Sequence, residues 1–210
     1  MKKPKPKRLL PVSVAVLMGG ESRRFGSPKA FLKYKRKSLA AHVLVQAGRY
    51  STEVFAVSRT LDQVPPDARK AFPIVLDQWK QKGPLAGLHS ALRHSSQPAV
   101  FMRGVDMPFF KGRVLKSFWA MFQEANWPDV IAPRINQRWE PLCALWNREL
   151  FARLRPGNWH SFQELLNEGK LKIRMVTEKE LKRLDPSFDC LRNFNTPQEW
   201  KKISSSNRIR

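Results

Sequence analysis

The sequence has little cysteine and no long apolar run. Its two cysteines, Cys143 and Cys190, are far apart and neither belongs to a CxxC motif, so we expect neither a disulfide framework nor a zinc site. Reduced thiols of this kind are typical of a cytoplasmic protein, which is the location we expect. The four histidines do not form a metal-ligand cluster in the sequence. No apolar run reaches the roughly 18 residues of a membrane helix, so no membrane span is expected.

The N-terminus imitates a secretory signal, because cationic MKKPKPKR is followed by apolar LLPVSVAVLM. A signal peptide should continue into a cleavage site of small residues. Here Pro11 interrupts the run, which then leads into GGESRRFG. The better interpretation is a buried first strand that follows a basic tail.

Acidic residues are scarce, with 17 Asp and Glu against 39 Lys and Arg, and the net charge is +22. The ends, residues 1–11 and 201–210, are basic without any acid, but most of the surplus lies between them. We expect a disordered basic tail at 1–11, a single domain at 12–200, and a basic C-terminal tail at 201–210. The surplus fits nucleic acid or an anionic small substrate as partner, or a role in solubility alone.

Short apolar runs alternate with helical patterns along the domain. Strands are expected at 12–18, 54–58, 74–76, 99–105, 130–133, 142–146 and 171–177. Helices are expected at 38–50, 85–93, 147–154 and 161–168, and at a last helix that begins TPQEW and is capped by Thr196. Because the early strands are apolar throughout, the pattern predicts a doubly wound α/β fold with a mostly parallel, twisted sheet covered on both faces.

Polar residues follow three of these strands. They are the loop after Leu17, Asp77 after the strand at 74–76, and Asp106 after the strand at 99–105. Ligands of such sheets bind at the carboxyl ends of the strands. The sequence therefore predicts that these three positions contribute to one site.

The loop VLMGGESRRFGSPKA, residues 16–30, has the composition of a phosphate site. Gly19 and the glycine after it allow a ligand to approach the backbone closely, and successive N–H groups in such a turn attract anions. Arg24 and Lys29 add charge that suits a triphosphate. The loop matches neither GxxxxGK[ST] nor GxGxxG, so a basic surface turn is the alternative.

Asp106 lies in RGVDMPF, directly after an apolar strand. A carboxylate in that position needs a partner. Mg²⁺ is one such partner, since it takes one or two carboxylates together with substrate phosphates. A turn or helix-capping role is the alternative for this residue taken alone.

Five motifs in this order resemble the molybdenum cofactor guanylyltransferases: LxGGxSRRFGxxKAxL, GPLAGLxSAL, VDMPF, EPLxALW and NxNTPQEW. The resemblance covers roughly residues 12–200. It implies a three-layer, Rossmann-like nucleotidyltransferase fold and a Mg²⁺-dependent enzyme that transfers GMP from GTP to molybdopterin. Other cofactor-biosynthesis proteins and acceptor molybdoenzymes would be further partners, and nucleic acid is not expected.

The resemblance also implies roles for single residues. Arg24, Lys29 and Asp106 would be catalytic, with Asp106 binding both GTP and Mg²⁺. The GTP site would comprise Leu17, Met18, Gly19, Lys29, Asp77 and Asp106. Asn193 and Asn195 would lie near the metal or the molybdopterin phosphate.

The chain departs from the family pattern at Met18, where the family usually has alanine, at Pro28, and at Gly104–Val105. These departures put substrate affinity in question rather than the reaction. Two alternatives stay open. A molybdopterin cytidylyltransferase is one, although those enzymes typically read LAAG where this chain reads LMGG. The other is a basic nucleic-acid-binding protein on the same scaffold, with Trp119, Trp127 and Trp139 as stacking residues.

Overall fold

The structure is a computed structural model that describes residues 9–18, 25, 28–77, 79 and 83–205. Its main sheet has the strand order β10-β7-β9-β6-β1-β4-β5, and β8 pairs with β7. The strands of this sheet are β1 (Leu10–Leu17), β4 (Ser51–Ser58), β5 (Ile74–Leu76), β6 (Ala99–Gly104), β7 (Val130–Ile135), β8 (Arg138–Trp139), β9 (Ala144–Asn147) and β10 (Ile173–Val176). A small hairpin joins β2 (Lys33–Tyr34) to β3 (Lys37–Ser38).

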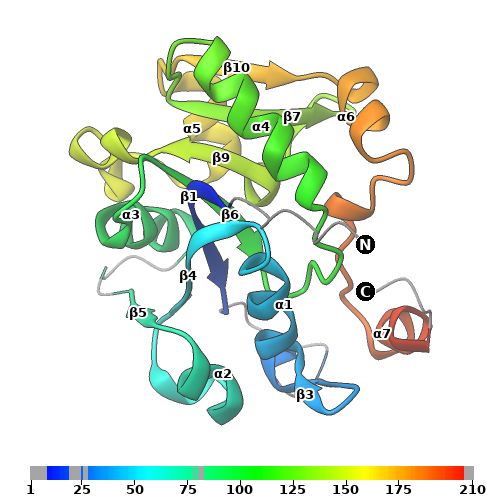
Figure 1. Cartoon of the computed structure of the whole chain (residues 1–210). Coiled ribbons are helices and arrows are strands. Elements are labelled where there is room, and N and C mark those ends of the chain that lie inside the picture. The colour runs from blue at the N-terminus through cyan, green and yellow to red at the C-terminus, as the bar shows by residue number, and fades with distance from the viewer. Residues whose placement is uncertain (1–8, 19–24, 26–27, 78, 80–82, 206–210) are drawn as a thin grey trace, which may run out of the picture.

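The sheet is mostly parallel, as predicted. β1 pairs in parallel with both β4 and β6, and β7 with β10. β9 runs antiparallel to its neighbours β6 and β7, and β8 runs antiparallel to β7. Figure 1 shows the twist of the sheet, since β1 and β10 run in very different directions. Because β4 also pairs in parallel with β5, the carboxyl ends of β5, β4, β1 and β6 form one continuous edge.

Helices cover both faces of the sheet. The helices are α1 (Leu39–Ala47), α2 (Pro66–Ala71), α3 (Pro84–His94), α4 (Gly112–Glu124), α5 (Phe162–Glu168), α6 (Glu178–Leu184) and α7 (Pro197–Ser205). Val14 and Val16 of β1 pack in the same core cluster as residues of α1, α4 and α6. Ala15 and Leu17 pack in a second cluster with residues of α3 and α5. Because its alternate side chains enter two cores, β1 is apolar at every position except Ser13, which is buried.

The seven expected strands are all present, with ends displaced by a few residues. The strand expected at 142–146 begins later, because residues Pro141–Cys143 form a 3₁₀ turn, η3. The helix expected at 147–154 is a short 3₁₀ helix, η4 (Arg148–Ala152). The structure also contains helices α2, α4 and α6, which were not predicted from the sequence. For α4 the signal is the helical spacing of Val114, Leu115 and Phe118, which are all buried.

The domain extends beyond the expected boundaries at residues 11 and 201, because residues of both expected tails belong to elements of the fold. Leu10 opens β1, pairing with Ser51 of β4. Residues 201–205 complete α7, where Ile203 is buried in the core. A basic composition does not prevent a helix from docking by its apolar side, and α7 does so. The other tail residues, 1–8 and 206–210, lie outside the described part of the chain.

Two of the three tryptophans of the stacking alternative belong to the core. Trp119 and Trp139 are 9% and 7% exposed, whereas Trp127 is 45% exposed. Trp119 contacts Phe122 and Trp127 in an aromatic cluster at the end of α4. A buried indole cannot stack on a base, so the structure favours core packing for Trp119 and Trp139.

Among the described residues, no helix combines the length and the apolar character that crossing a membrane would require.

Candidate active site

A lysine and a carboxylate from distant parts of the chain meet at the carboxyl edge of the sheet. Lys29 opens the short 3₁₀ helix η1 (Lys29–Phe31), and Asp106 follows the end of β6. The Lys29 ammonium donates to Asp106 Oδ2 at 2.9 Å, and the two side chains are 14% and 25% exposed. Both groups thus keep access to solvent, and to a ligand, while they hold each other in place.

The C-terminal segment completes this cluster. Lys29 Nζ also donates to the carbonyl oxygen of Phe194 at 2.5 Å and to Asn195 Oδ1 at 3.1 Å. It lies 5.1 Å from the centre of the Phe194 ring. An ammonium has three N–H donors, so the three acceptors use all of them. A phosphate that binds Lys29 must therefore replace one of these contacts.

The start of α7 fixes Asn195 in this position. Glu199 Oε2 accepts from the backbone N–H groups of Asn195 and Thr196, at 2.6 and 3.1 Å. These two hydrogen bonds hold the pKa of Glu199 below its usual value. Thr196 Oγ1 in turn accepts from Glu199 N at 3.2 Å, so Thr196 caps the helix as predicted.

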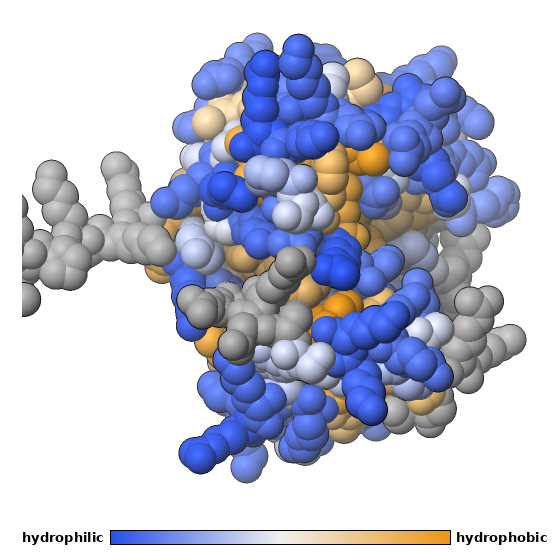
Figure 2. All heavy atoms as spheres, turned by 90° about the vertical axis from the view of Figure 1, so that its right-hand side faces the viewer, coloured by the Kyte–Doolittle hydropathy of each residue, from blue (hydrophilic) through white to orange (hydrophobic). Residues whose placement is uncertain are grey.

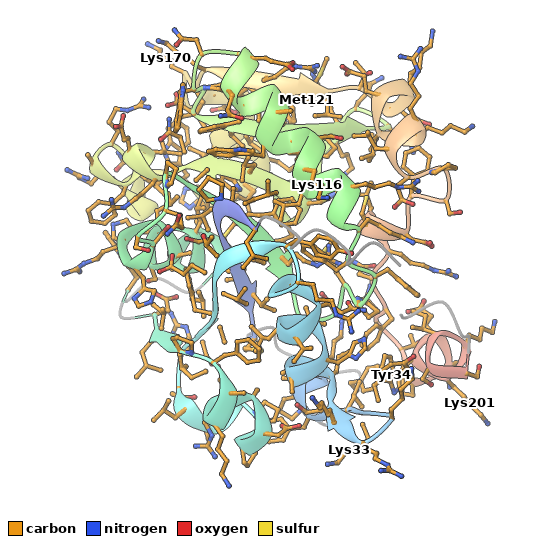
Figure 3. All side chains as sticks on the ribbon, in the orientation of Figure 1. Lys33, Tyr34, Lys116, Met121, Lys170 and Lys201 are labelled. Atoms are coloured by element: carbon orange, nitrogen blue, oxygen red, sulfur yellow. The ribbon has the colours of Figure 1, made fainter. Side chains whose placement is uncertain are left out.

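Trp200 anchors α7 to the rest of the fold. Its ring lies 4.9 Å from Phe194 and 6.2 Å from Tyr34 of β2. Figure 3 shows Tyr34 on the side of the hairpin that is nearer α7, and Lys201 on the outer side of α7. The last helix is therefore positioned by aromatic packing, and through Phe194 it positions the acceptors of Lys29.

The turn after β6 depends on a glycine. A Cβ on Gly104 would lie 2.5 Å from Asp106 Oδ1 and 3.6 Å from Leu142 Cδ1. The first distance is shorter than any real contact of that kind, so a side chain at residue 104 would displace the carboxylate. The departure from the family pattern at this position thus leaves the Asp106 carboxylate room to fold back over the strand end.

Behind this turn lies a charged residue that the sequence reading did not single out. Arg103, on β6, is 1% exposed, and its guanidinium donates to the carbonyl oxygen of Met107. It also lies 5.2 Å from the centre of the Phe110 ring. Burial lowers the pKa of Arg103. The Arg103 guanidinium thus ties the end of β6 to the backbone just beyond Asp106. The signal for this residue in the sequence is a cation inside an otherwise apolar strand.

The nucleotide side of the predicted site lies on β1 and β5. Leu17 and Met18 are buried, and Met18 N donates to the carbonyl oxygen of Val57 at 2.9 Å. Leu17 packs so closely on α3 that a Cβ on Gly87 would lie 2.7 Å from Leu17 Cδ2. Asp77 continues the pairing of β5, because its N–H donates to Ser58 O at 2.7 Å.

The structure brings together only part of the predicted set. Lys29, Asp106 and Asn195 are in contact, while Asp77 belongs to a separate group of hydrogen bonds with Trp79 and Ser90. Asn193 is exposed and, within the described residues, has no hydrogen bond to Lys29 or Asp106. Gly19 and Arg24 lie outside the described residues.

The oxygen atoms of Asp106 and Asn195 are of the kind that Mg²⁺ prefers. Among the described residues, no group of three or more His, Cys, Asp or Glu side chains could hold a metal ion. Asp106 supplies one carboxylate, and Asn195 Oδ1 accepts from the same Lys29 ammonium group that contacts this carboxylate. Carboxylate and amide oxygens suit Mg²⁺, which completes its shell with water and substrate phosphates.

Comparison with known proteins places this chain in a family. The model of the MobA-like NTP transferase domain matches residues 14–172. The chain belongs to this family.

Relatives in this family cover nearly the whole chain. A molybdenum cofactor guanylyltransferase from Desulfosudis oleivorans is 28% identical over 199 residues, which are 93% of this chain and 95% of the relative. A probable molybdenum cofactor guanylyltransferase from Methanothermobacter thermautotrophicus is 29% identical over 201 residues, 90% and 97% of the two chains. The matches with these relatives therefore span more of the chain than the family model, which ends at residue 172.

A solved structure agrees with the sequence relatives. The crystal structure of molybdopterin-guanine dinucleotide biosynthesis protein A from Archaeoglobus fulgidus matches with a TM-score of 0.74 and 26% identity. The match covers 91% of this chain and 96% of the other. The predicted three-layer nucleotidyltransferase fold is confirmed.

Proposed function

We propose that the protein is a molybdenum cofactor guanylyltransferase, which transfers GMP from GTP to molybdopterin and releases pyrophosphate. The family match and the names of the relatives support this activity. The observation that carries it in this chain is the contact of Lys29 with Asp106 at the carboxyl edge of the sheet. There a cation and an oxygen ligand for Mg²⁺ stand side by side, as nucleotidyl transfer needs.

The reaction joins two anions, and this is its main difficulty. A phosphate oxygen of molybdopterin forms a bond to the α-phosphorus of GTP, and the bond from that phosphorus to the β-phosphate oxygen breaks. The nucleophile is already ionised, so it needs no strong base. Lys29 would neutralise phosphate charge and stabilise the transition state, with Arg24 as a second cation. Leu17, Met18, Gly19 and Asp77 would bind the nucleotide, and Asn193 and Asn195 would border the molybdopterin phosphate.

Mg²⁺ would be held by Asp106 and would supply charge neutralisation at the phosphates. The surface suits such substrates as well. Hydrophilic residues cover most of the face shown in Figure 2, with apolar residues visible near its centre. The net charge of +22 attracts anionic substrates over long distances. A cytoplasmic location belongs to the proposal, because the two cysteines are free thiols.

The test compares GTP with CTP in dinucleotide formation on purified protein, with Mg²⁺ and molybdopterin. We expect turnover with GTP, and its loss in Asp106→Asn, which keeps the shape of the side chain and removes its charge. Glu180→Gln is the matched control, because it also removes a carboxylate from an ion pair, with Arg174 on β10. Turnover with CTP instead would establish the cytidylyl alternative. Absence of turnover with both, together with salt-sensitive binding of RNA or DNA, would favour the nucleic-acid alternative.

A further inference from the structure

Asp77 is held in one orientation by donors on one of its two carboxylate oxygens. Its Oδ1 accepts from Trp79 N at 3.1 Å and from Ser90 Oγ at 3.2 Å. Within the described residues, Oδ2 has no hydrogen-bond partner. Oδ1 is thus used by the protein, and as far as the described residues are concerned Oδ2 is available to accept from an N–H or O–H group of a ligand.

The residue that donates to Asp77 is itself held by a histidine of α3. The indole Nε1–H of Trp79 donates to His89 Nδ1 at 2.5 Å, and the ring centres are 4.6 Å apart. His89 is 6% exposed, and its other neighbour is the ring of Phe151 at 4.8 Å. The bond requires a neutral His89 with its proton on Nε2, because a protonated imidazole has no acceptor.

The main chain at Trp79 is fixed as well. Its carbonyl oxygen accepts from Arg59 Nη2 at 3.1 Å, just beyond the end of β4. Trp79 thus contacts residues beyond β4, on α3 and at the end of β5. None of these contacts contributes to the apolar core of the sheet. They fix instead the backbone N–H of Trp79, from which Asp77 Oδ1 accepts a hydrogen bond.

We propose that Trp79 and His89 are positioning residues for nucleotide binding, and that protonation of His89 loosens the hold of Trp79 on Asp77 and weakens the binding of GTP. The inference rests on the proposed function, since that function makes Asp77 part of the nucleotide pocket. Neither residue is catalytic, because both act through Asp77.

The charges around His89 set the pH at which the pair opens. Burial lowers its pKa below 6.5, and Arg93 and Arg155 lower it further, whereas Asp77 raises it. Arg93 lies on α3 itself, Arg155 precedes the turn at 156–158, and Phe151 on η4 carries no charge. At pH 7 the histidine is therefore neutral and the bond to Trp79 is intact. At acidic pH the protonated ring loses its acceptor, and the indole N–H is left without a partner.

Three variants separate this role from a general loss of stability. His89→Gln keeps an acceptor that does not titrate, His89→Phe removes the acceptor, and Trp79→Phe removes the donor. The measurement is the Kd of GTP with Mg²⁺ by calorimetry at pH 7.5 and pH 5.5, without molybdopterin. The melting temperature of each variant, measured in parallel, reports folding.

We expect Trp79→Phe and His89→Phe to raise the Kd of GTP about fivefold at pH 7.5, which is the effect of one lost hydrogen bond. His89→Gln should bind like the wild type at pH 7.5. From pH 7.5 to 5.5 the wild type should lose more affinity than His89→Gln, by at most about fivefold, the effect of the lost hydrogen bond, because only the wild type carries an imidazole that can be protonated. The terminal phosphate of GTP also titrates in this range, and the glutamine variant measures that contribution.

Two results would overturn the inference. If the wild type binds GTP and His89→Gln shows the same loss of affinity on acidification, His89 is not the titrating group. If both phenylalanine variants bind GTP as the wild type does, the pair does not position Asp77. A wild type that binds no GTP at either pH would overturn the proposed function together with this inference, so the two failures are distinguishable.

Discussion

The stability of this protein should fall between pH 7 and pH 5 because of one histidine in α1. His42 lies against the ring of Tyr34, with ring centres 4.6 Å apart. Among the described residues, its buried Nε2 has no hydrogen-bond partner. Burial, together with smaller contributions from Lys35, Arg49 and Lys37, lowers the pKa of His42 from 6.5 to about 4.

The sign follows from proton binding. In the unfolded chain His42 takes up a proton near pH 6.5, whereas in the folded protein it stays neutral down to about pH 4. Between these values the unfolded state binds more protons, so stability is intact above pH 6.5 and declines as the pH falls towards 4. At ~1.4 kcal/mol per pH unit, acidification to pH 5 would cost about 2 kcal/mol at full value. Because the ring is only partly buried and solvent screens the neighbouring cations, we expect about 1 kcal/mol.

The assay is urea unfolding of the wild type and His42→Leu at pH 7 and pH 5. Leucine cannot titrate, so the variant should lose about 1 kcal/mol less than the wild type on acidification. His89 titrates in both proteins and cancels in the comparison. Glu180, whose pKa Arg174 lowers to about 2, loses its contribution only below its unfolded value of 4.5. Equal losses of unfolding free energy in the two proteins would refute the reasoning.

Three further predictions follow from the contacts of single residues. Lys29→Met should lower kcat/KM for GTP about 10²- to 10³-fold, the usual effect of removing a transition-state donor; steady-state kinetics with near-normal values would contradict its role. Gly112→Ala should destabilise the protein by about 1–3 kcal/mol, because the new Cβ would lie 2.1 Å from a ring carbon of Tyr50. Gly48→Ala is the control in thermal unfolding, because the nearest atoms to its new Cβ would be 3.7 Å away. A chain that ends at residue 200 should be less stable than one that ends at residue 205, by about 1.5–3 kcal/mol for buried Ile203; equal melting temperatures would mean that α7 does not need this contact.

The sequence by itself determined where the strands lie along the chain, and it indicated the family to which the chain belongs. Strands such as β1 and β6 are buried on both faces, so apart from Ser13 and Arg103 they are apolar without alternation and stand out from their surroundings. Asp77 and Asp106 come just after the parallel strands β5 and β6, so the parallel topology alone places them on one edge. Five short motifs in a fixed order were enough to indicate the reaction.

The tertiary structure decided which of these residues touch. Asp106 comes 77 positions after Lys29, and Asn195 comes 166 positions after it. Nothing in the local sequence of these residues links them. The pairing of Trp79 with His89 likewise depends on how α3 packs beside β5. Local patterns record burial and helix caps, because these depend on residues a few positions apart. Contacts between distant side chains depend on the packing of the whole sheet and its helices, and here that packing builds the site.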